Sequence, residues 1–332
     1  MKAAASPAPM RGPIDLAVIG GYLGTGKTTM VNRLLEAPHG KRIAVLVNDF
    51  GAVNVDARLV RTRSDDVIEL DNGCICCTIG GALVDALGRV AARDERPDLL
   101  LIEASGVSDP AKIAQVGLVN GEFRLTAVLV VADAVEFVHT LADPLVGQMA
   151  QQQIDSASAV IVSKLDLLPH DARERAVADV RALAPTDMIV PADHGRVPLA
   201  LLFDDSIAQR RQAVNAARWR RPPASAMYPA FTSVAVAAPD VLDKARLRAW
   251  LKALPRTVLR AKGFVRVADE AGNVGTRVCQ VAARRLRMTA PEAPGGQTDA
   301  RACAMVFIGF IDTQTEARLR DGMRACCRAA TA

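Results

Sequence analysis

The chain has 332 residues, half of them apolar, so it is long enough for roughly two domains of about 150 residues each. It lacks any run of about 18 apolar residues, and its first 13 residues lack the apolar core of a signal peptide, which argues against a membrane span and against secretion. The net charge of +5 is small and the arginines are spread along the chain, unlike in a dedicated nucleic-acid binder. We therefore expect a globular protein of the cytoplasm, without membrane or nucleic-acid partners.

The first predicted strand, Ile14 to Ile19, leads into a glycine-rich loop that reads Gly-Gly-Tyr-Leu-Gly-Thr-Gly-Lys-Thr-Thr. Two glycines with four residues between them, Gly21 and Gly26, followed by Lys27 and Thr28, form the phosphate-loop pattern. The backbone N–H groups of such a loop surround a phosphate, its lysine reaches the outer phosphates, and its hydroxyl holds Mg²⁺. A helix is predicted from Thr28 to Glu36, and the partial positive charge at its N-terminus would attract the same phosphate. The predicted nucleotide-binding residues here are Gly21, Gly24, Thr25, Gly26, Lys27, Thr28 and Thr29.

The strand, helix and next strand alternate along the chain, which is typical of a mostly parallel, doubly wound α/β sheet. A strand predicted at Ile43 to Val47 enters Asn48-Asp49-Phe50-Gly51. The polar stretch from Ala52 to Asp66 is either a nucleotide-sensing switch or an ordinary surface loop.

Three of the four positions from 74 to 77 are cysteines, Cys74, Cys76 and Cys77. They follow a short strand predicted at Val67 to Leu70. In an extended segment the first two sulfurs face one side, and a turn brings in the third, which suits a soft or borderline metal. Three ligands leave one coordination position open. Two alternatives remain open for these cysteines: they are small buried core residues, or two of them form an oxidisable pair.

Two further buried strands are predicted to end in candidate site residues. The strand Asp98 to Glu103 places Glu103 at the carboxyl edge of the sheet, where it is the candidate acidic partner of Mg²⁺. Alternatively, Glu103 is a solvent-exposed carboxylate at the end of a strand, without a role in metal binding. After a strand predicted at Leu125 to Ala132, the strand Ala159 to Val162 leads into Ser163-Lys164-Leu165-Asp166.

These motifs resemble, in content and order, the CobW-type GTPases, which are GTP-dependent metal chaperones related to the urease and hydrogenase nickel-insertion GTPases. The most specific match is Asn-Gly-Cys-Ile-Cys-Cys-Thr, because phosphate loops occur in many unrelated enzymes. The resemblance implies GTP and Mg²⁺ as cofactors and Zn²⁺ or Co²⁺ as the second metal. It also implies base recognition by Ser163, Lys164 and Asp166, and a further metal-site acid at Asp49.

The chain departs from the family pattern at three places. Ser163 stands where the family usually has Asn in Asn-Lys-x-Asp, so Asp166 reads guanine without the supporting amide. Asp49 and Ala52 stand where members commonly have Glu and a further acid. The His-rich run of many members is missing, since the four histidines are isolated.

The second half predicts a smaller α+β domain, because a strand, a helix, several strands and a helix follow one another. We expect a flexible tail at 1–13, a phosphate-loop GTPase domain at 14–204, an Arg- and Pro-containing linker at 205–228, and a CobW-like C-terminal domain at 229–332. The strands are predicted at Phe231 to Ala237, Val258 to Val267, Arg277 to Val281 and Ala304 to Phe310.

The predicted function is that of a GTP-hydrolysing metallochaperone. In it, Lys27 neutralises phosphate charge, Thr28 and Glu103 organise Mg²⁺, and Asp166 reads guanine. The resemblance implies a client that is a metalloprotein or a metal-insertion enzyme, such as a cobalamin-pathway enzyme, nitrile hydratase or a zinc enzyme. We expect slow GTP hydrolysis that the client or a nucleotide-dependent homodimer accelerates. Two competing hypotheses are a phosphate-loop small-molecule kinase with a structural zinc site and an RNA-binding module that uses the linker.

Overall fold

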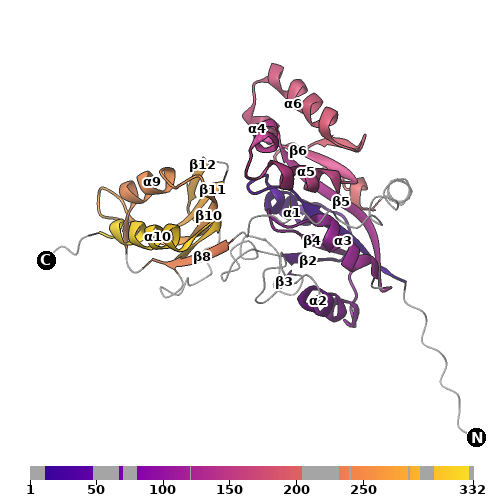
Figure 1. The fold of residues 1–332 in the computed structure, drawn as a ribbon. Coiled ribbons are helices and arrows are strands. Elements are labelled where there is room, and N and C mark those ends of the chain that lie inside the picture. The colour runs from indigo at the N-terminus through magenta and orange to yellow at the C-terminus, as the bar shows by residue number, and fades with distance from the viewer. Residues whose placement is uncertain are drawn as a thin grey trace, which may run out of the picture.

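The computed structural model describes residues 12–47, 67–69, 81–119, 121–203, 232–238, 241–282, 285–291 and 303–328 (Figure 1). We call residues 12–203 of this set the N-terminal unit and residues 232–328 the C-terminal unit. Each unit contains its own sheet. The predicted linker at 205–228 and residues 1–11 of the predicted tail lie outside the described residues, so those boundaries stay predictions.

The N-terminal unit is a parallel sheet in the order β3-β2-β4-β1-β5-β6-β7, with helices on both faces. Its strands are β1 Ile14–Gly20, β2 Ile43–Val47, β3 Val67–Glu69, β4 Leu99–Glu103, β5 Phe123–Asp133, β6 Ala159–Ser163 and β7 Ile189–Pro191. Its helices are α1 Lys27–Glu36, α2 Gly81–Ala91, α3 Pro110–Val119, α4 Phe137–Ala142, α5 Gly147–Asp155, α6 His170–Leu183 and α7 Ala200–Phe203, with a 3₁₀ turn η2 at Leu165–Leu167.

The strands of this sheet are continuous apolar runs because both faces of the sheet are covered. In β1, Leu16 and Val18 face one apolar cluster, which includes residues of α2 and α3, while Ala17 and Ile19 face another, which includes residues of α1 and α7. All four side chains are fully buried. The strand β1 lies between β4 and β5, so the loops that follow these strands meet at one carboxyl edge.

The C-terminal unit is a mainly antiparallel sheet in the order β12-β11-β10-β13-β8, with β9 paired in parallel to β10. Its elements are β8 Thr232–Ala237, β9 Leu242–Asp243, α9 Lys244–Lys252, β10 Val258–Ala268, β11 Val274–Ala282, β12 Arg285–Thr289, β13 Ala304–Gly309 and α10 Thr313–Ala325. The helices α9 and α10 cover one face, where Trp250 meets Phe307 edge-on with the ring centroids 5.7 Å apart. The side chains of Asp243 and Asp312 cap the two helices.

The predicted fold class, a phosphate-loop α/β sheet followed by a smaller α+β unit, is confirmed. The main elements that the sequence interpretation missed are α3, α4, α6, β7 and β12. The helix α6 is mostly polar, with Val180 as its buried residue, so it lacks a strong apolar stripe. No helix within the described ranges is long and apolar enough to cross a membrane.

Candidate functional site

The phosphate loop joins β1 to α1 and requires glycine for steric reasons. Gly21 and Gly24 have φ values of 130° and 81°, in the region that L side chains rarely adopt. A methyl group on Gly21 would also lie 2.4 Å from the carbonyl oxygen of Val131. The Lys27 side chain is buried, and its ammonium donates to the carbonyl oxygens of Gly21, at 2.8 Å, and Tyr22, at 3.2 Å. The Lys27 ammonium and the N-terminus of α1 therefore both lie at the phosphate loop.

The structure brings Thr28 and Glu103 together across 75 residues of sequence. The hydroxyl of Thr28 donates to Oε1 of Glu103 at 2.7 Å, and Glu103 is 3% exposed. The pairing follows from the sheet, because Ile19 of β1 lies beside Glu103 of β4 in parallel register, and both strands end at the same edge. A hydroxyl and a carboxylate are hard oxygen donors of the kind that Mg²⁺ prefers. The residues present therefore fit Mg²⁺.

A buried polar network fixes the loop that follows Glu103. The hydroxyl oxygens of Ser105 and Ser108 lie 2.8 Å apart, and the amide of Gln153 in α5 donates to the carbonyl oxygen of Ser108 at 2.8 Å. Asp109 accepts from the N–H of Ala111 at 2.9 Å at the start of α3, and burial raises the pKa of its carboxyl group. These contacts anchor the loop beside Glu103 independently of α1.

Ser163 connects the predicted base-recognition segment to the phosphate loop. Its buried hydroxyl lies 2.7 Å from the carbonyl oxygen of Thr25 and 3.0 Å from that of Ala132, so its single hydrogen serves either acceptor. Lys164 follows in a left-handed conformation, with φ of 60°. Asp166 lies in η2, with Oδ2 3.7 Å from Nδ1 of His194. The serine therefore contacts the loop backbone, while Asp166 follows at the edge of the sheet.

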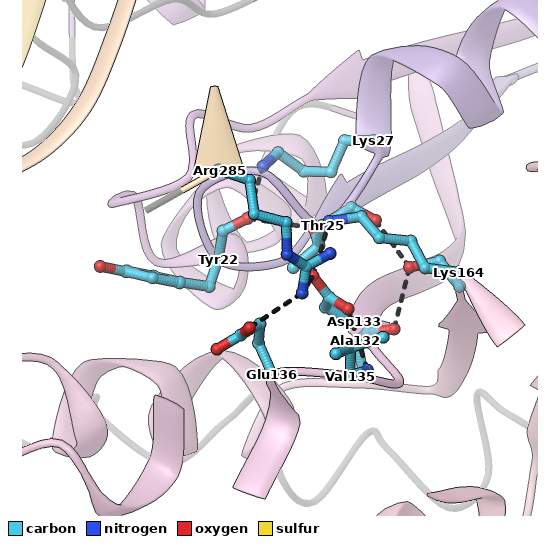
Figure 2. A network of polar contacts seen from close by, with 10 residues as sticks. Tyr22, Thr25, Lys27, Ala132, Asp133, Val135, Glu136, Lys164 and Arg285 are labelled. Carbon is cyan, nitrogen blue, oxygen red and sulfur yellow. Dashed lines mark hydrogen bonds and ion pairs between the residues drawn. The ribbon is translucent and has the colours of Figure 1, made fainter. Parts of the chain in front are cut away.

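Three charged residues that the sequence interpretation did not assign to the site lie next to this segment (Figure 2). The ammonium of Lys164 is 2.6 Å from Oδ2 of Asp133, which ends β5. Arg285 of β12 reaches across from the C-terminal unit, with its guanidinium 2.8 Å from Glu136 and 3.9 Å from Asp133. The only sequence signal for any of them was the position of Asp133 at the end of an apolar strand.

The predicted transition-metal ligands cannot be placed by the structure. Cys74, Cys76, Cys77 and Asp49 lie outside the described residues, so their arrangement stays a prediction. Among the residues that the structure does describe, no group of three His, Cys, Asp or Glu side chains is arranged to hold a metal. Thr29 lies on α1, where its Cγ2 would be 3.1 Å from a methyl group built on Gly195. Its predicted nucleotide contact also stays a prediction.

Two family models match the chain. The CobW/HypB/UreG nucleotide-binding domain matches residues 15–191, and the cobalamin synthesis protein CobW C-terminal domain matches residues 231–327. The chain belongs to the CobW/HypB/UreG family. This match confirms the predicted family and the predicted enzyme class, a phosphate-loop GTPase, and it argues against the kinase hypothesis.

Named relatives of this CobW-type chain differ in how much of it they cover. The zinc chaperone CobW of Sinorhizobium sp is 27% identical over 95% of this chain and 98% of that protein. The zinc chaperone YjiA of Escherichia coli (strain K12) is 33% identical over 58% of this chain and 61% of that protein. The crystal structure of Zn(II)-bound YjiA GTPase from E. coli covers 96% of this chain and 100% of that chain, with 23% identity and a TM-score of 0.44.

Proposed function

We propose that this GTPase is a metallochaperone that uses GTP hydrolysis to deliver a transition metal, zinc in the first place, to a client metalloprotein. The observation that carries the proposal is the meeting of Lys27, Thr28 and Glu103 at the carboxyl edge of a sheet whose strand β3 leads directly, in sequence, to the thiol motif. The names of the relatives CobW and YjiA, both zinc chaperones, support zinc over cobalt.

The described residues supply most of what phosphoryl transfer to water needs. Lys27 and the loop N–H groups neutralise charge on the outer phosphates, and the helix α1 starts at the same place. Thr28 and Glu103 would hold Mg²⁺, which neutralises further charge when bound. Water attacks the γ-phosphorus, the bond to the bridging oxygen breaks, and GDP and phosphate are released. Asp166 accepts hydrogen bonds from guanine, and Ser163 ties that segment to the loop.

The thiols Cys74, Cys76 and Cys77 are the proposed metal ligands, and the metal is the cargo of the reaction. Three thiolates leave one coordination position through which a client ligand can enter. This chemistry requires reduced thiols, so the cytoplasm is the compartment that we propose. The partners are GTP, the metal and the client, and a homodimer that forms on GTP binding is a candidate step in delivery.

The test compares metal binding and GTP turnover in matched cysteine variants under reducing conditions. The double variant Cys76→Ser, Cys77→Ser should lose one bound Zn²⁺ per chain and should keep its affinity for GTP in the presence of a chelator. The control is Cys327→Ser, which changes a half-buried thiol of the C-terminal unit and should keep the zinc. A double variant that binds zinc like the parent would overturn the assignment of the ligands.

A further inference from the structure

One face of the C-terminal sheet is turned toward the N-terminal unit. The opposite face is covered by α9 and α10. On the turned face, Val306 and Ile308 of β13 form an apolar cluster with Leu23 of the phosphate loop and with Val107 and Met149. The cluster joins the two units at the phosphate loop itself.

The end of β11 lies directly against this loop. A methyl group built on Gly24 would lie 2.4 Å from Cβ of Ala282, so the two backbones approach closely. Ala282 is paired across the sheet with Arg285, and cross-strand partners share a face. Arg285 is therefore carried on the same face as Ala282, beside the loop (Figure 2).

Arg285 is part of a group of four charged side chains whose formal charges sum to zero. Asp133 and Glu136 carry one negative charge each, and Lys164 and Arg285 carry one positive charge each. The Asp133 side chain is 6% exposed, so its carboxylate is largely removed from water; it is compensated by the ammonium of Lys164 at 2.6 Å, the N–H of Val135 at 3.0 Å and, at 3.9 Å, the guanidinium of Arg285. The Arg285 and Glu136 side chains are 38% and 30% exposed. Without Arg285, the other three residues would carry one net negative charge.

Other cations lie on the same sheet face. Lys262 of β10 is 4% exposed and pairs with Val306 across the sheet, and Arg260 pairs with Ile308. Since Val306 and Ile308 point toward the N-terminal unit, both cations are carried on that side. The C-terminal unit thus brings a basic face to a loop whose ligand is a polyphosphate anion.

We propose that Arg285 is a positioning residue of the nucleotide site, supplied by the C-terminal unit. It offsets the negative charge of Asp133 and Glu136, so that the site accepts the anionic nucleotide. Seating of the C-terminal unit on the phosphate loop and binding of nucleotide are consequently linked, and each favours the other. The proposal rests on the proposed nucleotide site and adds to it a residue from outside the nucleotide-binding domain.

The experiment measures GTP hydrolysis and the binding of a fluorescent GDP analogue to the full chain. Arg285→Ala should raise KM for GTP and weaken GDP binding by about fivefold, which corresponds to one uncompensated charge in a partly solvated site, and kcat should change by less than about twofold. Arg285→Lys should recover part of the loss. In the Arg285→Ala background, Glu136→Gln should restore affinity, because it returns the four-charge group to balance.

The matched control is Arg287→Ala, which removes the same charge from an exposed position on the same face of β12. It should leave KM unchanged. A further variant, Ala282→Leu, should push the sheet off Gly24 and raise KM, and adding Arg285→Ala to it should have no additional effect.

The proposal is overturned if Arg285→Ala binds nucleotide like the parent, if Arg287→Ala has the same effect, or if Glu136→Gln fails to restore affinity. Failure of the nucleotide site itself would look different, because the parent would then bind no GDP analogue. Hydrogen exchange of β11 and β12 with and without GDP reports the seating separately, and we expect slower exchange with GDP in the parent but not in Arg285→Ala.

Discussion

Ser163 gives the most direct test of the proposed base-recognition segment, Ser163 to Asp166. Its buried hydroxyl lies 2.7 Å from the carbonyl oxygen of Thr25, in the phosphate loop. The substitution Ser163→Ala removes this contact with little change in volume. One net hydrogen bond is worth about 1 kcal/mol, so the free energy of unfolding should fall by about that amount. Chemical denaturation of the parent and the variant, at equal Mg²⁺ and without nucleotide, measures the difference.

A second substitution, Ser163→Asn, introduces the residue that the resemblance places at this position. Its amide has two donor hydrogens and an acceptor oxygen, so it can keep the loop contact and also support the geometry of Asp166. We expect GTP to be preferred over ITP and ATP more strongly than in the parent, by about 1 kcal/mol or roughly fivefold. Competition against a fluorescent GDP analogue gives the ranking. An identical ranking in all three proteins would show that Ser163 takes no part in base recognition, and an unchanged stability of Ser163→Ala would refute the loop contact.

Three further outcomes are expected. Lys27→Ala should nearly abolish nucleotide binding while the circular dichroism spectrum stays native, and tight GTP binding by the folded variant would refute the phosphate-loop assignment. Glu103→Gln should keep the hydrogen bond from Thr28 but raise the Mg²⁺ concentration needed for half-maximal turnover by about tenfold or more, since the proposed carboxylate ligand is lost. Burial raises the pKa of Cys279 to about 12 and that of Cys326 to about 11, so both thiols stay neutral at pH 8 and should resist alkylation until the chain is unfolded.

The sequence predicted the parts of the site that depend on local chemistry and on parallel strands. The phosphate loop is a contiguous motif, and Glu103 could be placed because an apolar run in a parallel sheet ends at the ligand edge. The meeting of Thr28 with Glu103 then follows from the adjacency of β1 and β4.

The contact of Arg285 with Glu136 could not be predicted, since it joins positions 149 residues apart through the packing of two units. The strand β12 that carries Arg285 has five residues and mixes arginines with apolar residues, so its pattern was weak. The role of Ser163 was likewise hidden. In the sequence, Ser163 is visible only as a serine where the family pattern Asn-Lys-x-Asp has an asparagine. Its contact with Thr25 depends on β6 lying beside β5 and near the phosphate loop.

The metallochaperone proposal requires that GTP binding change the affinity of Cys74, Cys76 and Cys77 for the metal. The direct measurement is a titration of Zn²⁺ into nucleotide-free, GDP-bound and non-hydrolysable-GTP-bound protein, with Mg²⁺ present and thiols reduced. We predict that the GTP-like state binds Zn²⁺ more tightly than the GDP state, by about 5- to 150-fold, and that Zn²⁺ tightens GTP binding by the same factor. Equal zinc affinities in all three states would contradict the account and would leave a GTPase with a structural metal.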